Sequence, residues 1–299
     1  MISRVTQQTV RTSTLANLQG NLRTMADLQA RLSSGKNISK ASDDPSATGR
    51  TMSLRADYAA ATQAKRNADD GVTWLSQTDS SLQTTLSVLR RARDLTVQGA
   101  NSGVVNGVSA EAIATELEGL RDTLLDVANT TLNGRQIFAG TSAGGTTFTD
   151  ASGTPPYAWQ GTAAGSVDRR IGADATVRVD TNGEQVFGEG DESVFALLDS
   201  IAADLRNGVP VSARLNEIDD RMNTMLAAAT DVGVRMKQVT DVQSSLALRL
   251  QDLSSAISGI EDIDLAQTVM ELQMQEVAYQ GALGATARVL QPSLMDFLR

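Results

Sequence analysis

The sequence of 299 residues contains no cysteine and no histidine, and only 3% of its residues are aromatic. Without cysteine there can be neither a disulfide framework nor a thiolate nucleophile or metal ligand. Without histidine the chain lacks the commonest general base and the commonest metal ligand. These absences argue against an enzyme and against a bound cofactor, and the few aromatic residues favour slim helices packed by aliphatic side chains.

Long hydrophobic runs are also missing. No stretch approaches the roughly 20 apolar residues of a membrane-spanning helix, and no apolar signal-peptide core follows Met1. We therefore expect no membrane partner and no cleaved signal peptide. The net charge of −9 is uneven, because the start of the chain is basic and its end is acidic. A basic head could bind nucleic acid, but pairing of head and tail helices is the simpler explanation, so we expect no nucleic-acid partner.

The most regular pattern lies in residues 215–260. Apolar residues recur there at alternating steps of three and four, and Gln243 is the one polar residue on the stripe. Such a pattern predicts a helix of roughly 70 Å whose apolar stripe packs on another helix. After Ile260 the rhythm slips by one residue and resumes at Leu265. Ser258 and Glu261 have the spacing of a capping box, which predicts a break near Gly259.

The N-terminal part is predicted to form two helices. The first covers residues 1–34 and ends at Gly35, and its start (1–14) has a weak pattern that predicts poor order in an isolated monomer. Asp44 and Pro45 suit the cap and first position of the second helix, which should end near Gly99.

A third helix and a region of different character follow. Ser109 is expected to cap the third helix and Asn133-Gly134 to end it. Residues 175–179 alternate as a strand, and Asn182-Gly183 predicts a hairpin turn into a strand at residues 185–187. Residues 194–205 then predict a short amphipathic helix.

These patterns predict a mainly α-helical fold, a long antiparallel helical bundle or coiled coil formed by the N- and C-terminal parts with a small inserted β-rich domain. We expect a terminal helical assembly domain (1–40 plus 261–299), a helical rod core domain (41–138 plus 193–260) and the β-rich insert (139–192). The rod core is predicted to be built on apolar residues of the inner helices: Leu75, Leu82, Leu86, Leu120, Leu124, Met225, Val232, Leu246 and Leu253.

Acidic residues cluster near the predicted helix breaks, at residues 43–44 and 261–264, and could bind Ca²⁺. Capping of helix starts is the simpler explanation, because negative charge is stabilised there. Residues 180–184 are too short for a calcium loop. We predict no metal site, and a coiled-coil scaffold or sensor domain is the plainest alternative function.

Several ordered motifs resemble those of bacterial flagellins and their junction relatives: residues 32–36, 41–46, 67–72, 92–101 and the acidic motif 260–266. The resemblance covers about 1–140 and 195–299. It implies a non-enzymatic component of the flagellum, located outside the cell and exported through the flagellar type III channel without a cleaved signal peptide.

Residues 134–141 and the ending 292–299 resemble the hook–filament junction members of this family. Leu265 stands where flagellins commonly have an aromatic residue. The resemblance thus implies an adaptor that joins hook to filament through helical inter-subunit packing, with a short flagellin forming the filament itself as the alternative. The implied partners are a ring of like subunits, a hook-associated protein on the hook side, flagellin on the filament side and a cytoplasmic export chaperone at the C-terminal helix.

The terminal helices are predicted to supply the subunit interface, and to fold fully only against neighbouring subunits. The residues concerned are Leu15, Leu18, Leu22, Met25, Leu32, Leu265, Val269, Leu272, Tyr279, Leu283 and Leu290.

Overall fold

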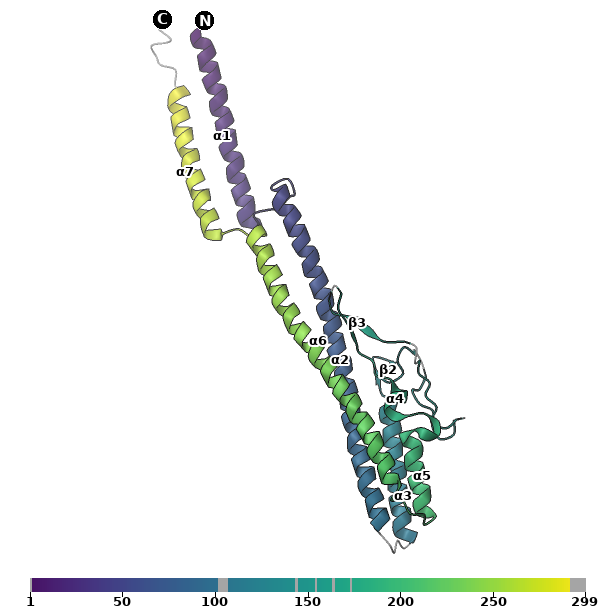
Figure 1. Cartoon of the computed structure of the whole chain (residues 1–299). Coiled ribbons are helices and arrows are strands. Elements are labelled where there is room, and N and C mark those ends of the chain that lie inside the picture. The colour runs from purple at the N-terminus through teal and green to yellow at the C-terminus, as the bar shows by residue number, and fades with distance from the viewer. Residues whose placement is uncertain are drawn as a thin grey trace. The chain divides into compact units, whose positions relative to one another are not determined.

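The computed structural model describes residues 2–101, 107–142, 145–153, 155–162, 165–172 and 174–290. Most of them are helical, which confirms the predicted class (Figure 1). The helices are α1 (Ile2–Ser34), α2 (Pro45–Asn101), α3 (Gly107–Ala128), α4 (Gly183–Phe187), the 3-10 helix η1 (Gly190–Glu192), α5 (Val194–Arg206), α6 (Arg214–Glu261) and α7 (Leu265–Leu290).

The strands form two short antiparallel pairs in the middle of the chain. β1 (Thr131–Leu132) pairs with β2 (Arg135–Gln136), and β3 (Asp168–Arg170) pairs with β4 (Thr176–Arg178). β4 confirms the strand predicted at residues 175–179.

The chain forms two compact units. The terminal unit contains Met1–Ala60 and Leu250–Arg299, and the core unit contains Ala61–Arg249. Helices α2 and α6 each contribute residues to both units. Helix α6, predicted from its long stripe, has 48 residues and is therefore about 72 Å long at 1.5 Å per residue.

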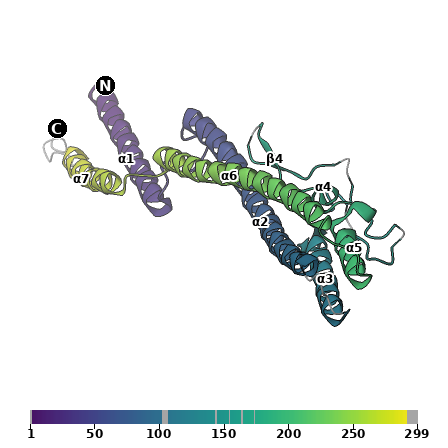
Figure 2. The same ribbon diagram turned by 60° about the horizontal axis from the view of Figure 1, so that its bottom comes forward.

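In the core unit, helices α3 and α5 lie beside α2 and α6 (Figures 1 and 2). The guanidinium of Arg206 near the end of α5 forms ion pairs with Glu111 and Glu118 on α3. Asp199, earlier on α5, pairs with Arg121, later on α3, so these two helices run antiparallel. Among the predicted rod core residues, Leu120 and Leu253 are half-buried and the rest are buried: Leu75, Leu82, Leu86, Leu124, Met225, Val232 and Leu246.

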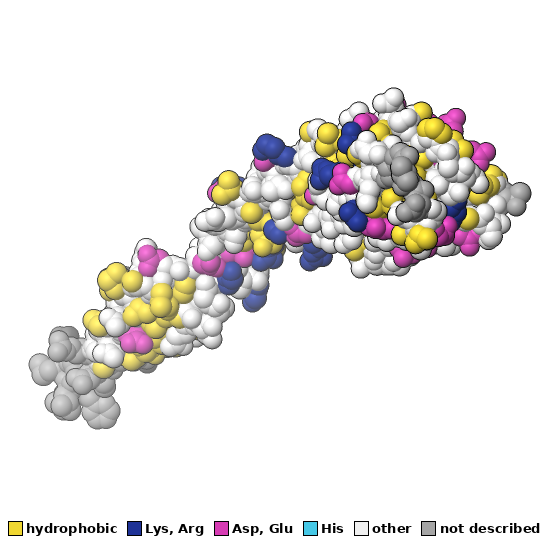
Figure 3. All heavy atoms as spheres, turned by 90° about the horizontal axis from the view of Figure 1, so that it is seen from below, with side chains coloured by type: hydrophobic (Ala, Val, Ile, Leu, Met, Phe, Trp, Pro, Cys, Tyr) yellow, Lys and Arg dark blue, Asp and Glu magenta, His cyan; other side chains and the backbone are white. Residues whose placement is uncertain are grey.

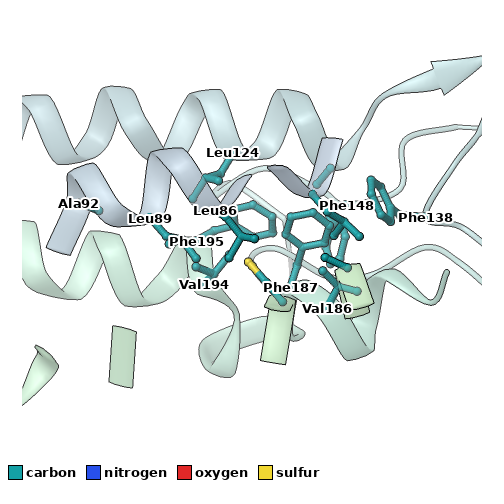
Figure 4. Close-up of a cluster of buried hydrophobic side chains, with 14 of the residues drawn as sticks. Leu86, Leu89, Ala92, Leu124, Phe138, Phe148, Val186, Phe187, Val194 and Phe195 are labelled. Carbon is teal, nitrogen blue, oxygen red and sulfur yellow. The ribbon is translucent and has the colours of Figure 1, made fainter. Parts of the chain in front are cut away.

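The middle region is held on the helices by an aromatic cluster (Figure 4). The ring of Phe187 lies edge-on to Phe138, with 5.1 Å between centroids, and Phe148 lies 5.3 Å from Phe195 in a similar arrangement. These rings pack toward Leu86 of α2 and are almost completely buried. The few aromatic residues of the chain are therefore concentrated where irregular backbone needs large apolar side chains.

A polar contact adds to this attachment. The hydroxyl of Tyr157 donates to a carboxylate oxygen of Asp199 on α5 at 2.5 Å, and Arg121 on α3 pairs with the same carboxylate at 2.5 Å. Burial raises the pKa of Tyr157, and the hydrogen bond to Asp199 raises it further. The carboxylate of Asp199 thus links the middle region to both α3 and α5.

Two of the four Asn-Gly pairs in the chain, Asn133-Gly134 and Asn182-Gly183, have roles different from those predicted. Asn133 and Gly134 form the two-residue turn between β1 and β2, with φ values of 52° and 77°, and α3 ends earlier at Ala128. Asn182 instead caps α4, because its side-chain oxygen accepts from the N–H of Glu184 at 2.9 Å. The predictions of a hairpin at Asn182 and of a strand at residues 185–187 were therefore wrong.

The predicted helix boundaries agree with the structure in part. Asp44 caps α2 as predicted, because its carboxylate accepts from the N–H of Ala47 at 2.9 Å. This hydrogen bond lowers the pKa of the Asp44 carboxyl. Ser109 does not cap α3, because the helix already begins at Gly107. The predicted break after the long stripe is present and lies at residues 262–264, a few residues after Gly259.

That break has a different cap from the predicted one. Ser258 and Glu261 lie within α6, while Asp264 accepts from the N–H of Gln267 at 3.0 Å and so caps α7. A one-residue slip in an apolar stripe indicates that a break exists, but the cap residue fixes where the next helix starts.

Candidate assembly interface

In the terminal unit, the break after α1 and the break after α6 lie side by side. Gly35 ends α1 with a φ of 69°, which glycine adopts at little cost. The N–H of Asn37 donates to the carbonyl of Glu261 at 2.6 Å, and the N–H of Ile263 donates to the carbonyl of Gly35 at 3.1 Å. We call this pairing of residues 35–37 with residues 261–263 the clip.

Charged side chains reinforce the clip. The ammonium of Lys36 lies 2.5 Å from Asp262 and 3.4 Å from Glu261, and the guanidinium of Arg55 lies 2.8 Å from Glu261. The hydrogen bond between Lys36 and Asp262 raises the pKa of Lys36 and lowers that of Asp262. The acidic residues near the breaks are thus engaged in capping and in ion pairs within the chain.

Helices α1 and α7 pack along each other beyond the clip (Figure 1). Leu28 is the least exposed apolar residue among the described side chains of α1. The side-chain amide of Gln275 on α7 donates to the carbonyl of Asn21 at 3.4 Å. On α7 the residues with low exposure recur at helical spacing, as Thr268, Leu272, Gln275 and Tyr279. One side of α7 is therefore covered by α1.

Apolar side chains also occupy the other sides of α7. Leu265, Val269 and Leu283 lie beside the covered side and are exposed. Met270, Met274 and Val277 lie on roughly the opposite side, where they are 57%, 64% and 69% exposed. We call these last three residues the back of α7; together with the polar residues Gln267, Glu271 and Gln273 they line a groove of about 620 Å³.

Helix α1 has the same character to a smaller degree. Leu15 and Leu22 are exposed, while Leu18, Met25 and Leu32 are half-buried. The space-filling view shows hydrophobic side chains gathered in patches over these terminal helices (Figure 3). The terminal unit therefore presents apolar surface that none of its described residues covers.

The residues predicted to form the interface fall into two groups, those partly covered within the subunit and those exposed on it. Leu18, Met25, Leu32, Leu272 and Tyr279 are half-buried, whereas Leu15, Leu22, Leu265, Val269 and Leu283 are exposed. The side chain of Leu290 and the ending 291–299 lie outside the described residues. The sequence analysis missed Leu28, Met270, Met274 and Val277, because it followed a single stripe on each helix. A signal was present, since α7 has apolar residues on every side and a single stripe cannot represent that.

Comparisons with known proteins agree on one family. The model of the bacterial flagellin N-terminal helical region matches residues 5–143, and that of the C-terminal helical region matches residues 215–298. Flagellin of Bacillus subtilis is 25% identical over 93% of both chains. Flagellar hook-associated protein 3 of Escherichia coli is 26% identical over 92% of this chain and 96% of its own.

Solved structures show the same fold. A flagellar hook-associated protein from Vibrio parahaemolyticus has a TM-score of 0.67 at 22% identity, covering 74% of this chain and all of its own. FlgL of Bacillus cereus has a TM-score of 0.59 at 24% identity, covering 69% of this chain and 99% of its own.

Long paired helices with uncovered apolar sides at both chain ends define a structural subunit rather than a catalyst. The chain belongs to the bacterial flagellin family. It is accordingly a structural protein of the flagellum, located outside the cell, and not an enzyme. No helix in the described part of the chain is both long and apolar enough to cross a membrane.

Proposed function

We propose that this protein is the adaptor subunit that joins the flagellar hook to the filament. It forms a ring of like subunits between a hook-associated protein on the hook side and flagellin on the filament side. The terminal helical domain supplies the contacts between subunits. The helical rod core domain and the inserted β-rich domain are the other two parts of the subunit. Support for this role comes from the flagellar hook-associated protein 3 of Escherichia coli, which matches along nearly its whole length.

One observation carries the assembly part of this proposal. Neighbouring exposed apolar residues commonly mark an interaction surface, and α1 covers only one side of α7. Met274 and Val277 remain 64% and 69% exposed in the single subunit. At about 25 cal/mol per Å² of apolar surface removed from water, neighbouring subunits gain free energy by covering the remaining sides.

The same surface explains how assembly is coupled to folding. Ordering a helix costs about 1–2 kcal/mol of backbone entropy per residue, and contact between α1 and α7 alone offsets little of it. We infer that both terminal helices order fully only against neighbouring subunits. A subunit with loose ends can pass a narrow export channel without a cleaved signal peptide, and a cytoplasmic chaperone bound to α7 would cover the apolar sides until export.

A short flagellin that forms the filament itself is the second candidate. The 25% identity with flagellin of Bacillus subtilis over 93% of both chains favours it. Both candidates use the same terminal helices and differ in where the subunit stands along the flagellum.

Immunogold labelling of isolated flagella with an antibody to this chain tests the proposal. A narrow band of label where hook meets filament is the expected result. Label along the whole filament would replace the adaptor with the flagellin candidate. Absence of label from flagella, in preparations where a known filament antibody binds, would overturn both.

A further inference from the structure

The chain has nine methionines and no cysteine, so methionine is its only oxidisable sulfur. Two of these methionines, Met270 and Met274, stand one helical turn apart on the back of α7 and line the same groove. They are 57% and 64% exposed, whereas Met225 of the core unit has no exposed surface. The most accessible sulfur on α7 therefore lies on the surface that assembly is proposed to cover.

We propose that Met270 and Met274 are oxidation sites of the unassembled subunit, and that their sulfoxides prevent the back of α7 from packing against a neighbouring subunit. In the reaction with a peroxide, the thioether sulfur gives an electron pair to one peroxide oxygen. A sulfur–oxygen bond forms, the oxygen–oxygen bond breaks, and hydrogen peroxide is reduced to water.

The consequence follows from polarity. A sulfoxide is a strong hydrogen-bond acceptor on a side chain that was apolar, and burying it without a donor is costly. In the free subunit these side chains are uncovered, so water solvates the new oxygen. In an assembly the same oxygen would face apolar side chains, and two such groups one turn apart would weaken the same contact twice. The effect on assembly rests on the proposed function, whereas the order of reactivity rests on exposure alone.

The order of reactivity is measured first, by mass spectrometry of the intact, folded subunit during treatment with hydrogen peroxide. Because reaction follows exposure, sulfoxide should form on Met270 and Met274 roughly tenfold or more faster than on Met225. Equal rates at these positions would overturn the assignment of the sites.

Assembly is measured with purified subunit that is treated with hydrogen peroxide, freed of peroxide and added to cells whose own copy of the gene is deleted. Immunogold counts of bound subunit should fall severalfold after treatment. The double variant Met270→Leu/Met274→Leu preserves apolar volume and should lose severalfold less binding on treatment than the wild-type protein. Met52→Leu is the matched control, because Met52 is 68% exposed on α2 in the same unit; this variant should remain sensitive.

The outcomes separate the two proposals. Undiminished binding of the treated wild-type protein, or an equal loss of binding by the treated double variant, would overturn the inference. If untreated protein fails to bind any flagella, the proposed function is what fails, and the rate comparison between Met270 and Met225 still decides whether the sites exist.

Discussion

The ammonium of Lys36 and a carboxylate oxygen of Asp262 lie 2.5 Å apart, on the two backbone segments that form the clip. Since the hydrogen bond raises the pKa of Lys36 above 10.5 and lowers that of Asp262 below 3.8, both groups are charged across the neutral range. The contribution of Asp262 is complete above the ordinary carboxyl pKa and is lost as pH falls through its lowered value. That of Lys36 is complete below the ordinary lysine pKa and is lost as pH rises through its raised value.

The substitution Asp262→Asn should therefore loosen the clip at neutral pH. We expect hydrogen exchange at the amides of Asn37 and Ile263 to become a few-fold faster, because exposed ion pairs contribute modestly. Exchange in α3 should not change. The difference between variant and wild type should shrink at high salt, and a difference that is independent of salt would show that the pair does not act through charge.

Two leucines two residues apart on α6 offer a matched test of the core. Leu246 is buried and Leu248 is 65% exposed. Leu246→Asp should destabilise the subunit by about 3–5 kcal/mol, because it removes a packed side chain and buries an unpaired carboxylate. Leu248→Asp should leave the thermal midpoint within a few degrees. Circular dichroism on heating measures both, and similar midpoints for the two variants would contradict the packing described for α6.

Assembly should depend on the exposed apolar residues of α7. Leu283→Asp should leave the subunit folded, since that side chain is already exposed, but incorporation into flagella should fall by an order of magnitude or more. Gln280→Asp is the control, because it adds the same charge to an exposed polar position of the same helix. Equal loss with both variants would mean that charge, and not apolar contact, is what the interface rejects.

The terminal helices should exchange their amides quickly in the free subunit. We expect hydrogen exchange in residues 8–30 and 270–287 to be much faster than in α3, because covering one side of a helix offsets little of its ordering entropy. In isolated flagella the same amides should become protected. Strong protection of these segments in the free subunit would contradict folding on assembly.

Tyr157 supplies a test of the middle region. Its pKa is raised by burial and by the bond to Asp199, so the stability that its neutral form provides is complete below pH 10 and is lost as pH rises through the raised pKa. Tyr157→Phe should cost about 1–2 kcal/mol in unfolding free energy, since it leaves Asp199 with one donor fewer.

The sequence could predict the long helices because their stripes repeat over many turns, as at residues 215–260. It could not distinguish the roles of Asn133-Gly134 and Asn182-Gly183, which are two of the four Asn-Gly pairs in the chain. Asn133-Gly134 turns a hairpin with both residues at positive φ, and Asn182 caps a helix whose Val186 and Phe187 are buried. Both sites have the same Asn-Gly dipeptide, and burial of the residues around it decides whether it forms a hairpin turn or a helix cap.

The register of α1 was ambiguous for a related reason. Its apolar residues are spread over more than one face of the helix, so the buried face could not be chosen from the sequence. Leu28 is buried, whereas Leu15 and Leu22 are exposed. The aromatic cluster joins Phe138 to Phe195 across the whole middle region, and no local pattern contains that pairing. Residues on the exposed sides of α7 could be found only once the covered side was known.

The carbonyl of Phe138 accepts from the N–H of Gly183 at 3.0 Å, so the chain leaves the helical layer and returns to it at neighbouring points. A loop whose base is closed can be lengthened at small entropic cost, because the cost grows only with the logarithm of its length. Foreign peptides inserted at the exposed turn around Ser152 would therefore be carried outside the helical packing, which makes this subunit a natural frame for peptide display.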